Sequence, residues 1–291
     1  ASNQVLGQQR QNFVSVKDET SGKVIIGVED GANNSYCDLL FYVNASKTIE
    51  EPNDRPVITP DDGNEPEKPD VTETKTGTLA FEDIWPGGGD YDMNDVIVEY
   101  NRAVSFDKKN QVTKIVDTFT PVHDGAVFAN AFAYQVDKGQ FGKMTFSATT
   151  EGIHTESATS SIIVCPNVKQ AIQKVYTITR EFTGGSFNKK DLKSYNPYII
   201  VKYAEGQKGR TEVHLPKHEA TSLADLSLAG TQKDAYYIDK EGAYPFAIDI
   251  PILNFISVTE KKSIDTEYPN FKAWADSKGE KYTDWYNNHV N

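Results

Sequence analysis

Apolar and polar residues alternate with a period of two along much of the chain beyond residue 78, which is typical of strands with one buried face. The clearest alternation covers 132–136 and 144–148. Gly, Asn, Asp and Pro residues bound further strand-like segments, at 95–100, 112–120, 161–165, 174–182, 198–203 and 246–252. Many short strands with little helix predict an all-β fold, an antiparallel β-sandwich or jelly roll.

One segment near the C-terminus has a helical pattern instead. Phe271, Trp274 and Ala275 recur with the spacing of one helix face. Pro269 suits the first position of a helix, and Gly279 suits the position just after its end. We therefore expect one short C-terminal helix in an otherwise β domain.

Residues 46–77 separate two parts of the chain. This segment contains five prolines, nine acidic and four basic residues and no aromatic residue, so it can bury little apolar surface to offset the entropy of ordering. We expect a linker here, followed by a β-sandwich domain over 78–291. Residues 1–45 are too few for an independent domain and are expected to be an appendage or the end of an upstream β module, with strands at 13–16, 24–28 and 39–43.

Composition narrows the class of partner. The 291 residues carry 30 basic and 42 acidic side chains, a formal net charge of −12, and no run of five basic residues, so nucleic acid is not an expected partner. No uncharged apolar stretch approaches the roughly 18 residues of a transmembrane helix. Cys37 and Cys165 lie far apart in the sequence; two unpaired core thiols are expected, and one long-range disulfide is the alternative.

The segments 27–43 and 80–100 match each other across the linker. Each reads as a strand ending in Glu-Asp, a loop, a polar cluster and an apolar strand. When Asp38 is aligned with Asp95, the second copy keeps carboxylates at positions where the first has mostly lost them. This asymmetry predicts two related modules, of which only the second has a competent site.

The second copy concentrates oxygen ligands on a glycine-rich turn, GGGDYDMND at 87–95. The spacing of two between Asp90, Asp92 and Asn94 lets one tight loop direct three side-chain oxygens inward, and clustered carboxylates repel one another unless a cation compensates. A hard cation such as Ca²⁺ takes about six to eight oxygen ligands. The candidate ligands of one Ca²⁺ are Asp90, Asp92, Asn94, Asp95, Asp83 and Glu82.

This turn does not fit an EF-hand. The twelfth position from Asp90 is Asn101 rather than Glu, and a strand follows instead of a helix. Soft metals are not expected, since the cluster holds no Cys or His. The alternative is a solvated acidic turn whose Asp and Asn side chains serve only backbone hydrogen bonds.

Several ordered motifs carry a resemblance to a known family. They are LAFEDIWP at 79–86 with GDYDMND at 89–95, DGA at 124–126 with NAF at 130–132, EVHLP at 212–216, and YPNFKAW at 268–274 with DWY at 284–286. Through these motifs the chain over about 78–288 resembles the LruC-type domain, found in secreted and surface proteins of Bacteroidetes and other bacteria. Residues 24–44 resemble the degenerate end of a second secreted module with an FED…DYND signature.

The resemblance implies an extracellular, outer-membrane-associated or periplasmic protein, often a lipoprotein, with an adhesin-like role and no known catalytic activity. We therefore expect a non-enzymatic protein with a structural calcium site, acting in cell adhesion or in recognition of a surface glycan or protein. The alternative is a secreted glycan-active enzyme or carbohydrate-binding module, because a pair of catalytic acids need not be close in sequence.

The histidines offer no sharper chemistry. His123 beside Asp124 lacks the nucleophile motif of a hydrolase. Pro216 breaks any helix that would align His214 with His218 as metal ligands. We expect no catalytic residue among them.

Overall fold

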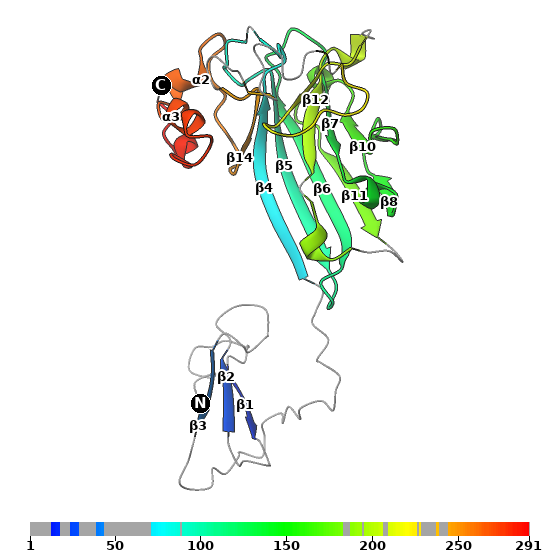
Figure 1. Ribbon diagram of the computed structural model, residues 1–291, viewed down its shortest axis with the longest axis vertical. Coiled ribbons are helices and arrows are strands. Elements are labelled where there is room, and N and C mark those ends of the chain that lie inside the picture. Colours follow the sequence, from blue (N-terminus) through cyan, green and yellow to red (C-terminus); the bar gives the residue numbers. More distant parts are fainter. Residues whose placement is uncertain are drawn as a thin grey trace. The chain divides into compact units, whose positions relative to one another are not determined.

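The chain divides into two compact units, Ala1–Glu67 and Lys68–Asn291. A computed structural model describes residues 13–17, 24–28, 39–43 and 71–290, with gaps in the last range at 88, 183–186, 194, 206–208, 226, 228–236 and 239–243. In the first unit, an antiparallel sheet is formed in chain order by β1 (Phe13–Lys17), β2 (Val24–Val28) and β3 (Leu39–Val43) (Figure 1). These are the strands that the apolar pattern of residues 1–45 predicts.

The expected linker, 46–77, lies outside the described residues up to residue 70. Its last part, 71–77, instead belongs to β4 (Val71–Phe81), which pairs along its whole length with β5 (Val96–Phe106). The strand therefore begins before the expected boundary at 78. Its first residues, VTETK, have exposed side chains on both faces and show no apolar alternation, which is why the pattern did not indicate a strand.

Two antiparallel sheets form the second unit. The first has the order β14-β4-β5-β6-β11-β8, with β6 (Val112–His123), β8 (Met144–Ala148), β11 (Tyr176–Phe182) and β14 (Ala247–Ile250). The second has the order β13-β12-β7-β10-β9, with β7 (Ala131–Gln135), β9 (His154–Glu156), β10 (Ser161–Cys165), β12 (Asn196–Ile200) and β13 (Glu212–His214).

The two sheets pack against each other through a shared aromatic and aliphatic core. The ring of Phe119 on β6 lies 5.1 Å from the ring of Phe132 on β7, and Phe81 of β4 lies 6.3 Å from the same ring. Leu79 and Val98 belong to this core as well. The protein is therefore an all-β, antiparallel β-sandwich, as the alternation predicts (Figure 1).

The opposite face of β4 and β5 is also covered. Ala80 and Ile97 point away from the second sheet and pack against the C-terminal segment, where Phe271 and Trp285 lie 4.8 Å apart. Both faces of the sheet are thus buried here, which explains the unbroken buried run at the end of β4. Figure 1 shows this cover as the orange and red segment beside β14.

The expected C-terminal helix is present as α3 (Phe271–Asp276). Gly279, with φ +84°, ends it and donates its N–H to the carbonyl of Trp274 at 3.0 Å. Two helices of a single turn were not expected, because four residues are too few to show a helical period. These are α1 (Lys138–Phe141) and α2 (Ile264–Glu267). Four 3₁₀ turns complete the described elements: η1 (Val168–Gln170), η2 (Lys189–Asp191), η3 (Tyr203–Glu205) and η4 (Trp285–Asn287).

A charged cluster lies inside the sandwich. Asp117 on β6 accepts hydrogen bonds from Arg102 Nε of β5 at 2.5 Å and from Arg180 Nη2 of β11 at 3.0 Å. The hydroxyl of Tyr134, on the second sheet, donates to the same carboxylate at 3.0 Å. One buried carboxylate therefore connects three strands of one sheet to the other sheet.

Candidate metal centre

The turn between β4 and β5 carries the clustered acids. Because Phe81 pairs with Val96, the two ends of this turn lie side by side at one edge of the sandwich. Two non-glycine residues inside it, Tyr91 and Met93, have left-handed backbones with φ of 56° and 55°. Met93 is fully buried, and the ring of Tyr91 contacts that of Phe246 at 5.6 Å, so side-chain packing offsets the cost of these conformations.

Three carboxylates converge on this turn. One oxygen from each of Glu82, Asp90 and Asp92 lies within 4.8 Å of the other two. Glu82 and Asp92 are buried, with 1% and 2% exposure, whereas Asp90 is exposed. A site with two buried acids and one at the surface is open to a cation from one side.

Glu82 is only half satisfied. Its Oε1 accepts a hydrogen bond from the backbone N–H of Met93 at 2.5 Å, but its buried Oε2 has no hydrogen-bond partner. Asp92, in contrast, accepts from the N–H of Asn94 at 3.3 Å and of Lys261 at 2.9 Å. A Cβ at Gly89 would come within 2.8 Å of Glu82 Oε2, so the turn needs glycine there to make room for this oxygen.

Burial and mutual repulsion disfavour the ionised form of the carboxyl groups in this cluster. Burial, followed by the charge of Asp95, raises the pKa of Glu82 well above its usual range. Burial also raises the pKa of Asp92, and the neighbouring charge of Asp90 adds to this. A divalent cation would reverse both effects, because it compensates the charge that burial and repulsion oppose.

Asp83 and Asp95 engage each other. The N–H of Asp83 donates to Asp95 Oδ2 at 2.7 Å, and Asn130 Nδ2 donates to Asp83 Oδ2 at 2.7 Å. Burial, followed by the charge of Asp83, raises the pKa of Asp95 to about 7. Neighbouring residues of an extended chain point to opposite sides, which accounts for the separation of Asp83 from Glu82.

Asn94 holds the turn in place. Its Nδ2 donates to the carbonyl of Val258 at 3.1 Å, which attaches the turn to the C-terminal segment. Its Oδ1 is buried without a hydrogen-bond partner and lies where a Cβ on Gly125 would come within 2.6 Å. Of the six expected ligands, the geometry groups three as a cluster, Glu82, Asp90 and Asp92.

Sequence reasoning missed the residues that support this region. Lys169 pairs with Asp124 at 3.2 Å and also donates to the carbonyl of Ala126. Asn130, which anchors Asp83, lies in the NAF motif, but no spacing rule connects that motif to the acidic turn. Contacts of this kind arise from strand pairing, so they have no local signal.

The other candidate residues have structural surroundings. His214 is buried between Asn196 at 2.8 Å and Glu212 at 2.9 Å, whereas the ring of His218 lies 3.4 Å from the carbonyl of Pro216. Cys165 is a buried free thiol, and burial raises its pKa. Its suggested partner Cys37 lies outside the described residues.

Fold and site together define an antiparallel β-sandwich protein with a partly buried acidic turn between two neighbouring strands. The chain belongs to the family described as Domain of unknown function (DUF4842), whose model matches residues 110–286. The acidic turn precedes the matched region. No curated protein matches the sequence.

A solved structure shares the fold. It is described as a "Putative lipoprotein from Bacteroides ovatus", and its superposition has a TM-score of 0.56 with 16% sequence identity, covering 96% of this chain and 91% of that one. At this identity the likeness concerns the fold alone. Among the described helices, none is long and apolar enough to cross a membrane.

Proposed function

We propose that this is a non-enzymatic secreted or cell-surface protein of the LruC type, stabilised by one Ca²⁺ and acting in adhesion or in recognition of a surface glycan or protein. The observation that carries the calcium assignment is the buried, unpartnered Oε2 of Glu82 beside Asp90 and Asp92. A buried carboxylate oxygen without a partner is costly, and a cation would satisfy it.

The chemistry of the cluster favours calcium among common cations. It contains only oxygen donors, which suit hard cations. Its three carboxylates leave positions for water in a shell of about six to eight ligands, whereas Mg²⁺ demands a stricter octahedron. The cation would connect the end of β4 to the turn that leads into β5.

The surface location is proposed on two grounds. The structural neighbour from Bacteroides ovatus bears the name of a lipoprotein. The ordered motifs between 79 and 286 resemble a domain of secreted and surface proteins. Attachment or recognition is the role that these grounds favour.

The enzymatic alternative has weaker support. Glycoside hydrolysis uses two carboxyl groups facing one cleft. Of two cavities in the second unit, one is lined by a single carboxylate, Asp249, and the other by a single carboxylate, Glu99. Asp249 is already paired with Lys75, and Glu99 accepts the N–H of Asn254. These surroundings favour binding over hydrolysis.

Calorimetric titration of calcium into the Asp92→Asn protein tests the assignment. The full chain should bind one Ca²⁺ and the variant none, because Asn keeps the shape of the side chain but removes its charge. Asp107→Asn is the matched control, since Asp107 lies in another turn, where its carboxylate accepts the backbone N–H groups of Lys109 and Gln111. Equal calcium binding by the Asp92 variant would contradict the proposal.

The role in recognition needs a separate measurement. A glycan and surface-protein binding screen of the full chain, run with calcium and with EGTA, should detect a ligand that is bound more tightly with calcium. Turnover of a glycan substrate in the same screen would favour the enzymatic alternative instead.

A further inference from the structure

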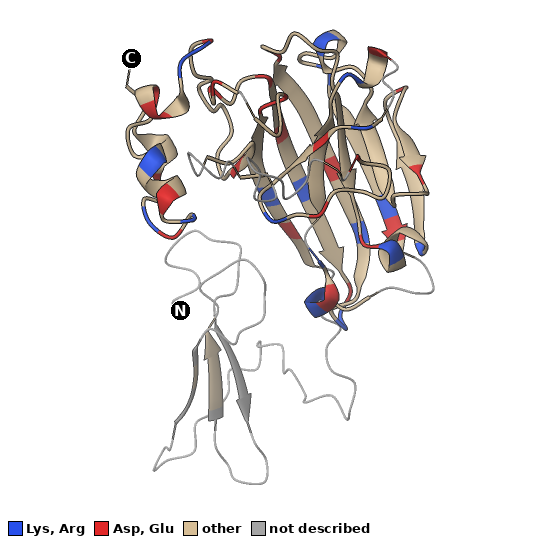
Figure 2. Ribbon diagram, turned by 45° about the horizontal axis from the view of Figure 1, so that its top comes forward, with Lys and Arg blue, Asp and Glu red and all other residues tan. Residues whose placement is uncertain are grey.

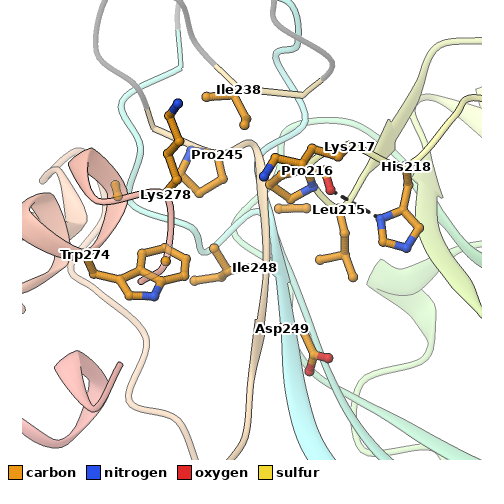
Figure 3. A pocket seen from close by; sticks show the side chains of 13 residues that line it. Leu215, Pro216, Lys217, His218, Ile238, Pro245, Ile248, Asp249, Trp274 and Lys278 are labelled. Carbon is orange, nitrogen blue, oxygen red and sulfur yellow. Dashed lines mark hydrogen bonds between the residues drawn. The ribbon is translucent and has the colours of Figure 1, made fainter. Parts of the chain in front are cut away.

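A cavity of about 300 Å³ opens beside α3. Four segments line it: the loop after β13, Ile238, the residues from Pro245 into β14, and the C-terminal turn of α3 (Figure 3). Its walls are mostly apolar and are formed chiefly by Leu215, Pro216, Ile238, Pro245, Ile248 and Trp274. A volume of this size is at the small end of ligand pockets in proteins.

The rim of this cavity is cationic. Lys217 and Lys278 reach it from different segments, and Figure 3 shows them on either side of Pro245. Both lysines are exposed, and neither forms an ion pair among the described residues. The one acid in the lining, Asp249, is occupied by Lys75 at 2.8 Å and by the hydroxyl of Tyr100 at 2.8 Å. The rim therefore has an uncompensated positive charge on a chain of net charge −12.

The backbone holds both lysines in unusual conformations. Lys217 and Lys278 have φ of 67° and 58°, a region that non-glycine residues seldom occupy. Lys278 stands in the turn that ends α3, where its N–H bonds to the carbonyl of Ala275 at 2.8 Å. Glycine is the usual residue at such a position. These backbone conformations set the direction in which each lysine side chain leaves the chain at the rim.

We propose that this cavity binds a small amphipathic carboxylate, an anion with an apolar body such as a medium-chain acyl group. The apolar walls and the indole of Trp274 would receive the body, and the ammonium groups of Lys217 and Lys278 would receive the carboxylate. A sugar would leave hydroxyl groups unpaired against walls of Leu, Ile and Pro. The inference gives a ligand class to the proposed recognition function and rests on that function for its biological role, but not on the cation.

Binding of octanoate to the full chain tests this inference. Calorimetry in saturating calcium should show one octanoate per chain, and the blue shift of tryptophan fluorescence should follow the same curve, since Trp274 lines the cavity and is only half-buried. The uncharged analogue 1-octanol should bind at least tenfold more weakly. The double variant Lys217→Gln, Lys278→Gln should lose at least tenfold in octanoate affinity while binding 1-octanol as before.

Lys272→Gln provides the matched control. Lys272 lies on α3 as well, but it pairs with Asp276 at 2.9 Å and does not line the cavity. The Lys272→Gln protein should bind octanoate with unchanged affinity. Circular dichroism and melting curves establish that every variant is folded.

Three results would overturn the inference: no octanoate binding at millimolar concentration, equal binding by the double variant, or binding of glucuronate in place of octanoate. Calcium titration of the same samples separates the two proposals. Intact calcium binding without octanoate binding would refute the cavity assignment alone, and the reverse result would refute the calcium assignment alone.

Discussion

At the scale of single residues, the unpartnered oxygen of Glu82 should lower the melting temperature without calcium and raise it when calcium binds. Glu82→Gln keeps an acceptor for the N–H of Met93 and replaces the unpaired oxygen with a neutral donor beside Asp90 and Asp92. In EGTA at pH 8 the variant should therefore melt at a higher temperature than the unmodified protein. Added calcium should raise the melting temperature of the unmodified protein only.

Differential scanning fluorimetry measures both effects. Calcium at a hundredfold excess over Kd should stabilise the unmodified protein by about 2.7 kcal/mol. Glu181→Gln, at an exposed position of β11, should change neither melting temperature. A variant that melts lower in EGTA would show that Glu82 stabilises the turn without a cation.

The acids of the turn also make stability depend on pH. Burial and the charge of Asp83 raise the pKa of Asp95 to about 7, well above its value in the unfolded chain. Between these two pKa values the folded protein holds more protons than the unfolded protein, so in EGTA the free energy of unfolding should fall as the pH rises from about 4 to about 7. The stabilisation by calcium should be greater at pH 8 than at pH 5, because the cation needs ionised carboxylates.

Urea unfolding across this pH range, with calcium and with EGTA, measures the dependence. Asp95→Asn should flatten the curve recorded in EGTA. A free energy of unfolding that rises through the same interval in EGTA would mean that Asp95 is stabilised as the anion in the folded protein.

At the scale of elements, Asp117 connects three strands. Burial acts to raise the pKa of this carboxyl, but the charges of Arg102 and Arg180 outweigh burial and hold it below its usual range. Asp117→Ala would leave two buried guanidinium groups without their carboxylate, which should cost about 3–5 kcal/mol in urea unfolding. Asp276→Ala removes a pair on the surface of α3 and should cost less than about 0.5 kcal/mol.

The same cluster shows what the sequence pattern could reveal. β7, with its apolar alternation, and β10, with its apolar run, were predictable because both lie over the core. The second half of β5 was not expected, because the inward-facing position of Arg102 holds a charge instead of an apolar side chain. Local pattern does not show that Asp117, fifteen residues later, neutralises it.

The acidic turn was predictable only as far as local sequence spacing determines it. Alternating Asp90 and Asp92 lie close in sequence, so their meeting follows from the turn itself. Glu82 joins this cluster but Asp83 stays outside it, because the two residues face opposite sides of the extended chain. The pairing of β4 with β5 determines which of the two residues faces the acidic turn, and the spacing of residues in the sequence does not specify this pairing.

At the scale of the whole molecule, the chain divides between Glu67 and Lys68. The fragment 68–291 retains both sheets, the acidic turn and the cavity beside α3. We expect it to fold alone, to bind one Ca²⁺ with the affinity of the full chain and to melt at the same temperature. Calorimetry and circular dichroism of the fragment provide the check. A fragment that melts several degrees lower would indicate that residues 1–67 stabilise the second unit.

Under the proposed role in adhesion, the direction of β4 has a mechanical consequence. The strand enters the sandwich at Val71, and its far end at Phe81 leads into the acidic turn. A pull on Val71, resisted through β5 by the rest of the sandwich, would act along the strand axis. The backbone hydrogen bonds to β5, from Val71 opposite Phe106 to Phe81 opposite Val96, would then be loaded in shear together rather than opened one after another. Force along the path by which the chain enters the sandwich therefore meets all eleven paired positions of β4 and β5 at once.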